Sequence, residues 1–121
     1  MMAFFKKTLH TFTEGADQKP VIWYESDYVA VREGLGHTGS PEVESHFDAV
    51  KMTIEAPDQV RKDKNYPNRL CYYAIFPDDP YYPNHWMKVV LEQNRRGKLR
   101  VVTAYFTTEF KVGEEQIWKK L

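Results

Sequence analysis

The sequence predicts an α+β fold, in which a small antiparallel β-sheet packs against one main α-helix and a short helix ends the chain. Residues 40–56 have the apolar spacing of an amphipathic helix. Three segments rich in β-branched and aromatic residues are the expected strands: 70–76, 86–93 and 99–108. The last eight residues, EEQIWKKL, carry apolar side chains that a short helix would lay onto the sheet.

Composition narrows the class of protein before any element is placed. The chain has 121 residues, 42% of them hydrophobic and 28% charged, which suits one globular domain spanning residues 1–121. Cys71 is the only cysteine, so no disulfide can form within the chain. No apolar run reaches the length of a membrane span, and the N-terminal residues lack the pattern of a signal peptide. We therefore expect a cytoplasmic protein with no membrane partner.

The first third of the chain gives the least definite elements. Residues 1–20 fit a strand or a helix, because their phenylalanines and leucine are interspersed with threonines that weaken a helix. The segment VIWYESDYVAVRE, residues 21–33, favours one bent strand or two short ones because it is rich in β-branched and aromatic residues. The run GLGHTGS, residues 34–40, predicts a loop.

The main helix is marked at both ends. Ser40 is a suitable N-cap, Pro41 suits the first helical position, and the glutamates that follow complement the helix dipole. Its apolar positions recur at steps of three and four: Val43, Phe47, Val50 and Ile54. Ala56-Pro57 should end the helix. The polar segment that follows is expected to place only Val60 in the core.

The segments 86–93 and 99–108 flank NRRGK and predict a β-hairpin whose register decides which side chains share a face. If Gly97 takes a positive φ in a type I turn with a bulge, Lys88 and Thr103 lie on opposite faces. That register makes four pairs: Asn94–Lys98, Glu92–Arg100, Val90–Val102 and Val89–Thr103. If Arg95-Arg96 instead form a two-residue turn, Lys88 lies opposite Thr103. We favour the first register, which has the better turn chemistry and pairs opposite charges.

The motifs of the common enzyme classes are missing from the sequence. The four histidines and Cys71 lack metal-ligand spacing, and Asp78-Asp79 lie in a proline-rich loop where they suit a turn. The glycine-rich run lacks the Lys-Ser/Thr of a P-loop, and no nucleophile elbow surrounds a serine. We therefore expect neither a metal nor a cofactor.

Metal-free acid–base chemistry on RNA remains compatible with the residues present. Such cleavage needs a base, an acid, and a cation or hydroxyl that stabilises the phosphate oxygens. His37 lies in the glycine-bracketed loop before the main helix, and a histidine can serve in either proton-transfer role. Lys88 and Arg100 on the hairpin would supply cations, and Thr103 or Tyr105 a hydroxyl.

Five motifs point to a known family. They are GHTGSPEV, a helix ending in IEAPDQV, the strand YYAIF, and the strands MKVVLE and RVVTAY. In this pattern residues 28–106 resemble the barnase–EndoU–colicin–RelE-like (BECR) nuclease folds, closest to the phage- and mobile-element-associated branch. By that resemblance His37 would be the general acid/base, Lys88 the phosphate partner, and Thr103 the hydroxyl on the last strand.

The chain departs from the family pattern around the first of these residues. The family often has a histidine directly before Pro-Glu, whereas Thr38-Gly39-Ser40 separate His37 from Pro41-Glu42. A second histidine upstream is also missing. His46, expected on the flank of the main helix, is therefore an alternative acid/base.

The resemblance implies a metal-independent endoribonuclease that cleaves RNA, such as tRNA, to a 2′,3′-cyclic phosphate. Arg100, Tyr105 and His46 would contact the substrate, and an antitoxin or immunity protein would be a further partner. The competing interpretation is a non-catalytic interaction or accessory domain on the same fold, which the net charge of zero favours. A pocket for a small apolar ligand rests only on the aromatic content of 15%.

Overall fold

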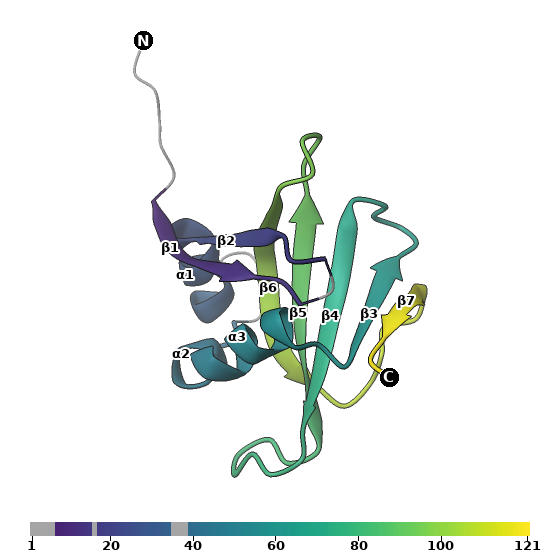
Figure 1. Cartoon of the computed structure of the whole chain (residues 1–121). Coiled ribbons are helices and arrows are strands. Elements are labelled where there is room, and N and C mark those ends of the chain that lie inside the picture. Colours follow the sequence, from purple (N-terminus) through teal and green to yellow (C-terminus); the bar gives the residue numbers. More distant parts are fainter. Residues whose placement is uncertain (1–6, 16, 35–38) are drawn as a thin grey trace.

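The fold is built around one seven-stranded β-sheet with three short helices on one side (Figure 1). The computed structural model describes residues 7–15, 17–34 and 39–121. The elements are β1 (Thr8–Thr13), β2 (Pro20–Tyr24), α1 (Glu25–Glu33), α2 (Glu42–Ser45), α3 (Phe47–Glu55), β3 (Gln59–Asp63), β4 (Arg69–Phe76), β5 (His85–Gln93), β6 (Leu99–Thr107) and β7 (Glu114–Lys119). The strand order across the sheet is β1-β2-β6-β5-β4-β3-β7.

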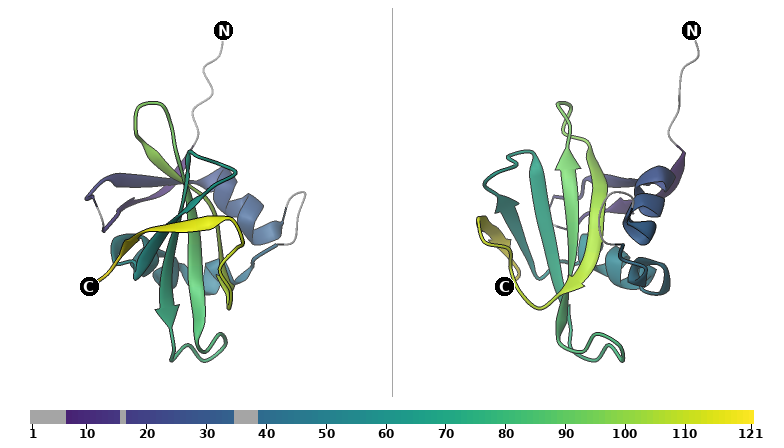
Figure 2. Two further views of the ribbon diagram at one scale, coloured as in Figure 1. Left: turned by 90° about the vertical axis from the view of Figure 1, so that its right-hand side faces the viewer. Right: turned by 180° about the vertical axis from the view of Figure 1, so that it is seen from behind.

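The predicted architecture, a small antiparallel sheet against one main helix, is wrong. Strands hold 44% and helices 20% of the described residues. The sheet is mixed, because β2 runs parallel to β6 where Val21 pairs with Leu99 and Ile22 with Arg100. Three short helices take the place of one main helix, with α3 against β4 and β5 and α1 against β6 (Figure 2).

The predicted main helix is divided at His46. His46, with φ −118° and ψ 34°, has a non-helical backbone and lies between the last residue of α2 and the first residue of α3. The apolar stripe is nevertheless as predicted, since Val43, Val50 and Ile54 are fully buried and Phe47 packs against the same core. α3 ends at Glu55, as Ala56-Pro57 predicted.

Residues 21–33 contain the last four residues of β2 and the nine residues of α1, so the prediction of strand throughout is wrong. β2 ends at Tyr24, and α1 begins with acidic residues in its first turn. α1 ends where Gly34, at φ 72°, takes the left-handed conformation and donates its N–H to the carbonyl of Ala30. These start and stop signals outweigh the β propensity of the valines and tyrosine between them.

Two further strands were not predicted. β3 lies in the segment expected to be polar loop, and its Val60 is buried, as expected. The C-terminal segment forms β7 and not the predicted short helix, because it pairs antiparallel with β3 from Gln59–Lys119 to Asp63–Glu114. Pairing with the exposed edge of a sheet therefore decides the conformation of this segment.

The β5–β6 hairpin follows the favoured register at its turn and departs from it further along. Gly97 has φ 79°, the N–H of Asn94 donates to the carbonyl of Lys98, and Glu92 pairs with Arg100. A β-bulge then shifts the ladder between Val90 and Leu91. The pairs beyond it are Val90–Thr103, Val89–Ala104 and Lys88–Tyr105.

The sheet has apolar residues on both faces. The larger core lies on the helix side and includes Phe12, Trp23, Tyr72, Val89, Leu91 and Val101. A smaller cluster on the opposite face consists of Cys71, Tyr73 and Val90, with Trp86 and Val102 packed against it. Among the described residues no helix is long and apolar enough to cross a bilayer, since α1 and α3, the longest, have nine residues each.

Candidate functional site

The break between α2 and α3 places His46 against the loop that joins β4 to β5. Its Nε2 lies 2.9 Å from Oδ2 of Asp79, and both side chains are largely buried. Asp79 is fixed in turn, because its Oδ1 accepts the backbone N–H groups of Tyr81 and Tyr82 at 2.9 and 2.8 Å. The imidazole is therefore held by a carboxylate that the loop itself orients.

The second ring nitrogen of His46 is also engaged. Nδ1 lies 2.9 Å from Oγ of Ser45 and 3.2 Å from the main-chain carbonyl oxygen of Glu42. Both ring nitrogens thus face oxygen atoms, the carboxylate on one side and the hydroxyl and carbonyl on the other. Ser45 is exposed at the molecular surface.

Aromatic side chains hold the imidazole on its other sides. Phe106 contacts it edge-on, with the ring centroids 5.1 Å apart, and Tyr82 does so at 5.6 Å. Tyr82 in turn stacks on Phe106 at 4.4 Å. The ring orientation is thus fixed by packing as well as by hydrogen bonds.

An open cleft of about 400 Å³ lies beside this histidine. Its lining residues are Pro41, Glu42, Ser45, His46, Tyr81 and Tyr82. Tyr81 is 79% exposed, which is unusual for a large aromatic residue and leaves its ring free to stack on a planar ligand. None of the lining residues is a lysine or an arginine.

The pKa of Asp79 shows that the loop stabilises its charged form. Partial burial opposes ionisation, but the N–H donors of Tyr82 and Tyr81 and the charge of His46 outweigh it. The pKa of Asp79 therefore lies below its usual value. The carboxylate is accordingly in its acceptor form at neutral pH.

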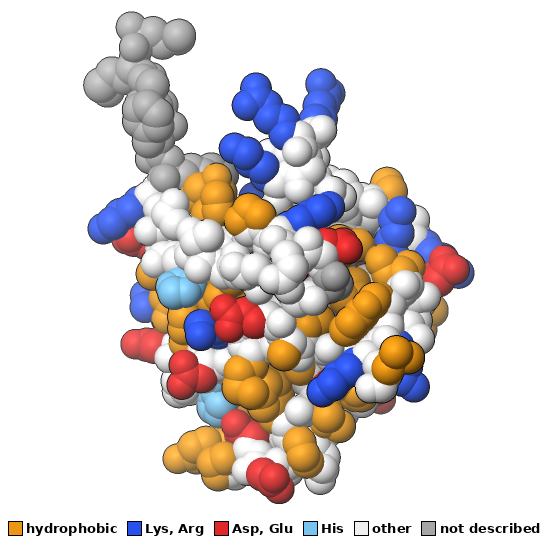
Figure 3. Space-filling model, in the orientation of Figure 1, with side chains coloured by type: hydrophobic (Ala, Val, Ile, Leu, Met, Phe, Trp, Pro, Cys, Tyr) orange, Lys and Arg blue, Asp and Glu red, His pale blue; other side chains and the backbone are white. Residues whose placement is uncertain are grey.

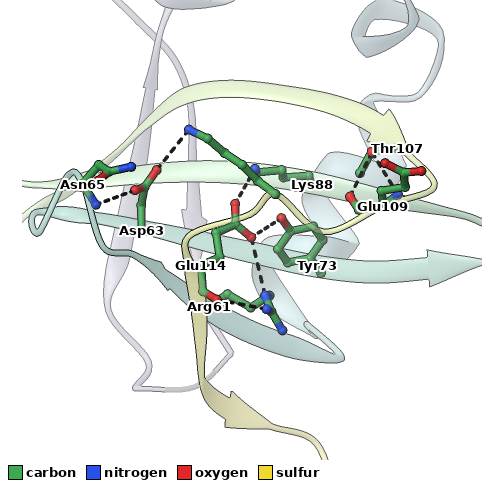
Figure 4. Close-up of polar contacts among 9 residues, drawn as sticks. Arg61, Asp63, Asn65, Tyr73, Lys88, Thr107, Glu109 and Glu114 are labelled. Atoms are coloured by element: carbon green, nitrogen blue, oxygen red, sulfur yellow. Dashed lines mark hydrogen bonds and ion pairs between the residues drawn. The ribbon is translucent and has the colours of Figure 1, made fainter.

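Lys88, the predicted phosphate partner, lies on the face of the sheet away from the helices and is only 3% exposed. Its ammonium donates to Oε2 of Glu114 at 2.6 Å, and Tyr73 donates its hydroxyl to Oε1 at 2.5 Å (Figure 4). Burial is the largest single influence and opposes the charge on Lys88, but the hydrogen bond to Glu114 and the electrostatic effects of Tyr105, Cys71 and Glu114 together raise its pKa. Lys88 is thus a charged side chain with an internal partner.

The bulge brings Thr103 and Tyr105 to the same face as Lys88. Tyr105 of β6 lies directly opposite Lys88 of β5. Thr103, two residues before Tyr105 on β6, lies opposite Val90, two residues after Lys88 on β5. The side chains of Thr103 and Tyr105 are half-buried. The favoured register predicted Lys88 and Thr103 on opposite faces, and the bulge makes that prediction wrong. The sheet separates both residues from His46.

Arg100, predicted to contact substrate, is held by two carboxylates. It donates to Oε1 of Glu92 at 2.9 Å and to Oδ2 of Asp27 at 3.2 Å. Partial burial of Glu92 opposes its ionisation, but Arg100 and Arg69 outweigh it and lower the pKa of Glu92. Arg100 therefore ties α1 to the β5–β6 hairpin.

His37, the predicted general acid/base, lies in the 35–38 segment, outside the described residues. The described loop around it begins at Gly34 and resumes at Gly39, two residues before Pro41 of the cleft. Among the described residues, no three His, Cys, Asp or Glu side chains gather closely enough to hold a metal ion.

Sequence reasoning missed two residues of these clusters. Asp79 was assigned to a turn, which it does form, but its second oxygen faces His46. Only the fold brings the two together, since 33 positions separate them in the chain. Glu114 was placed in a helix, where its burial against Lys88 has no sequence signal.

Exposed charges are separated along the molecule. Lys and Arg side chains gather at the upper end in Figure 3, where the β5–β6 turn carries the exposed Arg95, Arg96 and Lys98. The cleft at the other end has Glu42 and Asp79. The exposed basic side chains of the turn therefore lie away from the cleft.

Comparison with known proteins adds no assignment. The chain matches no protein-family model, no curated protein and no solved structure. The functional interpretation therefore depends on the geometry of His46 and its neighbours and on the sequence motifs.

Proposed function

We propose that the chain is a metal-independent endoribonuclease in which His46 transfers a proton. The observation that carries this proposal is the 2.9 Å contact between His46 and Asp79 at the wall of an aromatic cleft. A carboxylate that orients an imidazole and stabilises its charged form is a recurring arrangement in acid–base catalysis. The cleft also offers Tyr81, on which an unpaired base can stack.

The cleavage step has a defined proton balance. The ribose 2′-oxygen forms a bond to phosphorus, the bond from phosphorus to the 5′-oxygen breaks, and the product is a 2′,3′-cyclic phosphate. The imidazolium of His46 gives its proton to the departing 5′-oxygen, with Ser45 next to it at the cleft surface. The 2′-hydroxyl proton goes to a second base, the role that the sequence predicts for His37.

The competing function is a non-catalytic interaction domain, and one observation favours it. Lys88 and Arg100, the two cations of the predicted site, are both paired with internal carboxylates. A catalytic phosphate site normally keeps its cations available to the substrate. We further propose a cytoplasmic setting, because Cys71 has no partner thiol in the chain, and RNA as the partner, with an immunity protein still a prediction.

Cleavage of total RNA in the presence of EDTA tests this proposal. The wild-type protein should give discrete fragments with cyclic-phosphate ends, and His46→Gln should lose about 100-fold or more of the rate. His10→Gln, a histidine change on β1 outside the cleft, is the matched control and should cleave like wild type. His37→Gln should also lose activity if that residue is the second base.

Two results would count against the proposal. Intact RNA after incubation with wild-type protein, over RNA pools that include tRNA, would favour the interaction domain. Fragments produced equally by wild type and His46→Gln would remove His46 from the chemistry.

A further inference from the structure

The C-terminal strand is attached to the sheet by an unusual side chain. Of the six residues of β7, only Glu114 is buried; Trp118 is half-buried and the other four are exposed. Trp118 packs against the larger core, but the one buried residue of the strand is a glutamate, a residue type that is almost never fully buried unless it is paired. The attachment of β7 to the sheet therefore depends on the groups that surround the Glu114 carboxylate.

Glu114 lies in a cradle of donors from three neighbouring strands (Figure 4). Lys88 of β5 donates to Oε2, and Tyr73 of β4 donates to Oε1. Arg61 of β3 places its Nε 3.5 Å from Oε1 and donates from a second nitrogen to the main-chain carbonyl of Glu114. Two cations and a phenol thus converge on one small anion.

The cradle holds one donor more than the carboxylate satisfies. The Nε of Arg61 is buried and has no hydrogen-bond partner among the described residues. Lys88 and Tyr73 donate to the two oxygens of the carboxylate, and neither oxygen accepts a hydrogen bond from this Nε. A phosphate group presents a third oxygen, and guanidinium groups bind it well.

We propose that Lys88, Tyr73 and Arg61 form a binding site for a phosphate group, which the C-terminal strand closes with its own Glu114. The bound carboxylate and a phosphate have the same charge sign and use the same donors, so the two compete. Opening requires release of the segment before β7 and of the pairing between β7 and β3. The site lies across the sheet from His46 and does not depend on cleavage there.

The segment that leads into β7 is suited to such opening. Val112 is 95% exposed, and Gly113 takes φ 92° at the bend into the strand. Phe110 provides the apolar contact, with its ring 5.0 Å from Tyr73 and 4.5 Å below the Arg61 guanidinium. A surface segment with few buried apolar groups opens at low free-energy cost.

Phosphate binding to purified full-length protein tests the proposal. Affinity is measured by titration calorimetry with inorganic phosphate, at constant ionic strength, for wild type and for Glu114→Gln. Apparent affinity scales with the open fraction, so a strand closed in about nine-tenths of molecules predicts about tenfold tighter binding in the variant. Glu109→Gln, the same charge change on the exposed part of the segment, is the matched control and should bind like wild type.

A double variant assigns the gain to the cradle. Lys88→Met added to Glu114→Gln should return phosphate affinity to the wild-type level or below. Equal affinity in Glu114→Gln and Glu109→Gln, or a gain that survives Lys88→Met, would overturn the proposal. A tetranucleotide run in parallel identifies the source: tighter binding than phosphate indicates an RNA backbone, and equal binding indicates free phosphate.

Hydrogen exchange in the wild-type protein provides a measurement that needs no variant. Phosphate should accelerate amide exchange along residues 115–119, because the bound ligand holds β7 away from β3. The exchange of β5, which stays in the centre of the sheet, is the internal reference. Unchanged exchange in β7 over the same phosphate titration would contradict the competition between Glu114 and phosphate.

Discussion

The ammonium of Lys88 and the carboxylate of Glu114 meet at 2.6 Å, with side chains that are 4% and 0% exposed. Neither side chain is accessible to bulk water in this position, so the ammonium of Lys88 depends on Glu114 to compensate for its burial. Burial opposes the charge on Lys88, but the hydrogen bond to Glu114 and the electrostatic effects of Tyr105, Cys71 and Glu114 together raise the Lys88 pKa. The contribution of the Lys88 charge to stability is therefore present at neutral pH and is lost as pH rises through the folded pKa of Lys88.

Removing Lys88 alone should destabilise the protein strongly. Lys88→Met removes from the buried Glu114 the nearer of its two cations, and breaking a buried pair in this way costs about 3–5 kcal/mol. Urea unfolding of the two single variants and of Lys88→Met with Glu114→Gln measures the coupling. The double variant should lose less than the sum of the single losses; simple additivity would mean that the two charges do not interact.

The contact between Asp79 and His46 should make stability depend on acid pH. Because the pKa of Asp79 is lowered in the folded protein, its contribution is present above the unfolded value of about 3.9 and disappears as pH falls through the folded value. Asp79→Asn should cost about 1–3 kcal/mol at pH 7, as expected for hydrogen bonds to a charged group. Urea unfolding between pH 7 and pH 3 should show this difference closing in acid. A gap that stays constant over that range would refute the assignment.

Gly15 should not tolerate a side chain. A Cβ there would lie 2.1 Å from the carbonyl oxygen of Glu55, where the β1–β2 turn meets the end of α3. We expect Gly15→Ala to cost about 1–3 kcal/mol or more in the free energy of unfolding, as other overpacked sites do. Gly97→Ala is the control, since its nearest neighbour is a flexible side chain at 3.5 Å and only its φ of 79° opposes the change, at about 1 kcal/mol. Equal losses would mean that the turn moves away from α3.

Local signals in the sequence predicted part of this structure. The stripe of Val43, Val50 and Ile54 follows from helical spacing, and the pairing of Glu92 with Arg100 follows from the turn at Gly97. Each of these depends on neighbours within a few residues. Local chemistry was sufficient there because no distant partner competes with it.

The rest depends on partners that are distant in the chain. β7 is a strand because β3 offers it an edge, and a single segment cannot reveal that edge. The bulge at Val90 and Leu91 changes which residues share a face. The sequence does not reveal it, because the predicted register and the observed one both bury valines. Asp79 reaches His46 only once α2, α3 and the β4–β5 loop are in place.

The most direct test of the proton-transfer role of His46 is chemical rescue of RNA cleavage. Cleavage of a labelled RNA in EDTA is measured for wild type and for His46→Gly, each with and without added imidazole, after circular dichroism has shown that the variant is folded. We expect His46→Gly to lose about 100-fold or more of the rate and imidazole to restore part of it, since the vacated position beside Asp79 admits the free ring. A folded His46→Gly protein that cleaves at the wild-type rate would contradict the account.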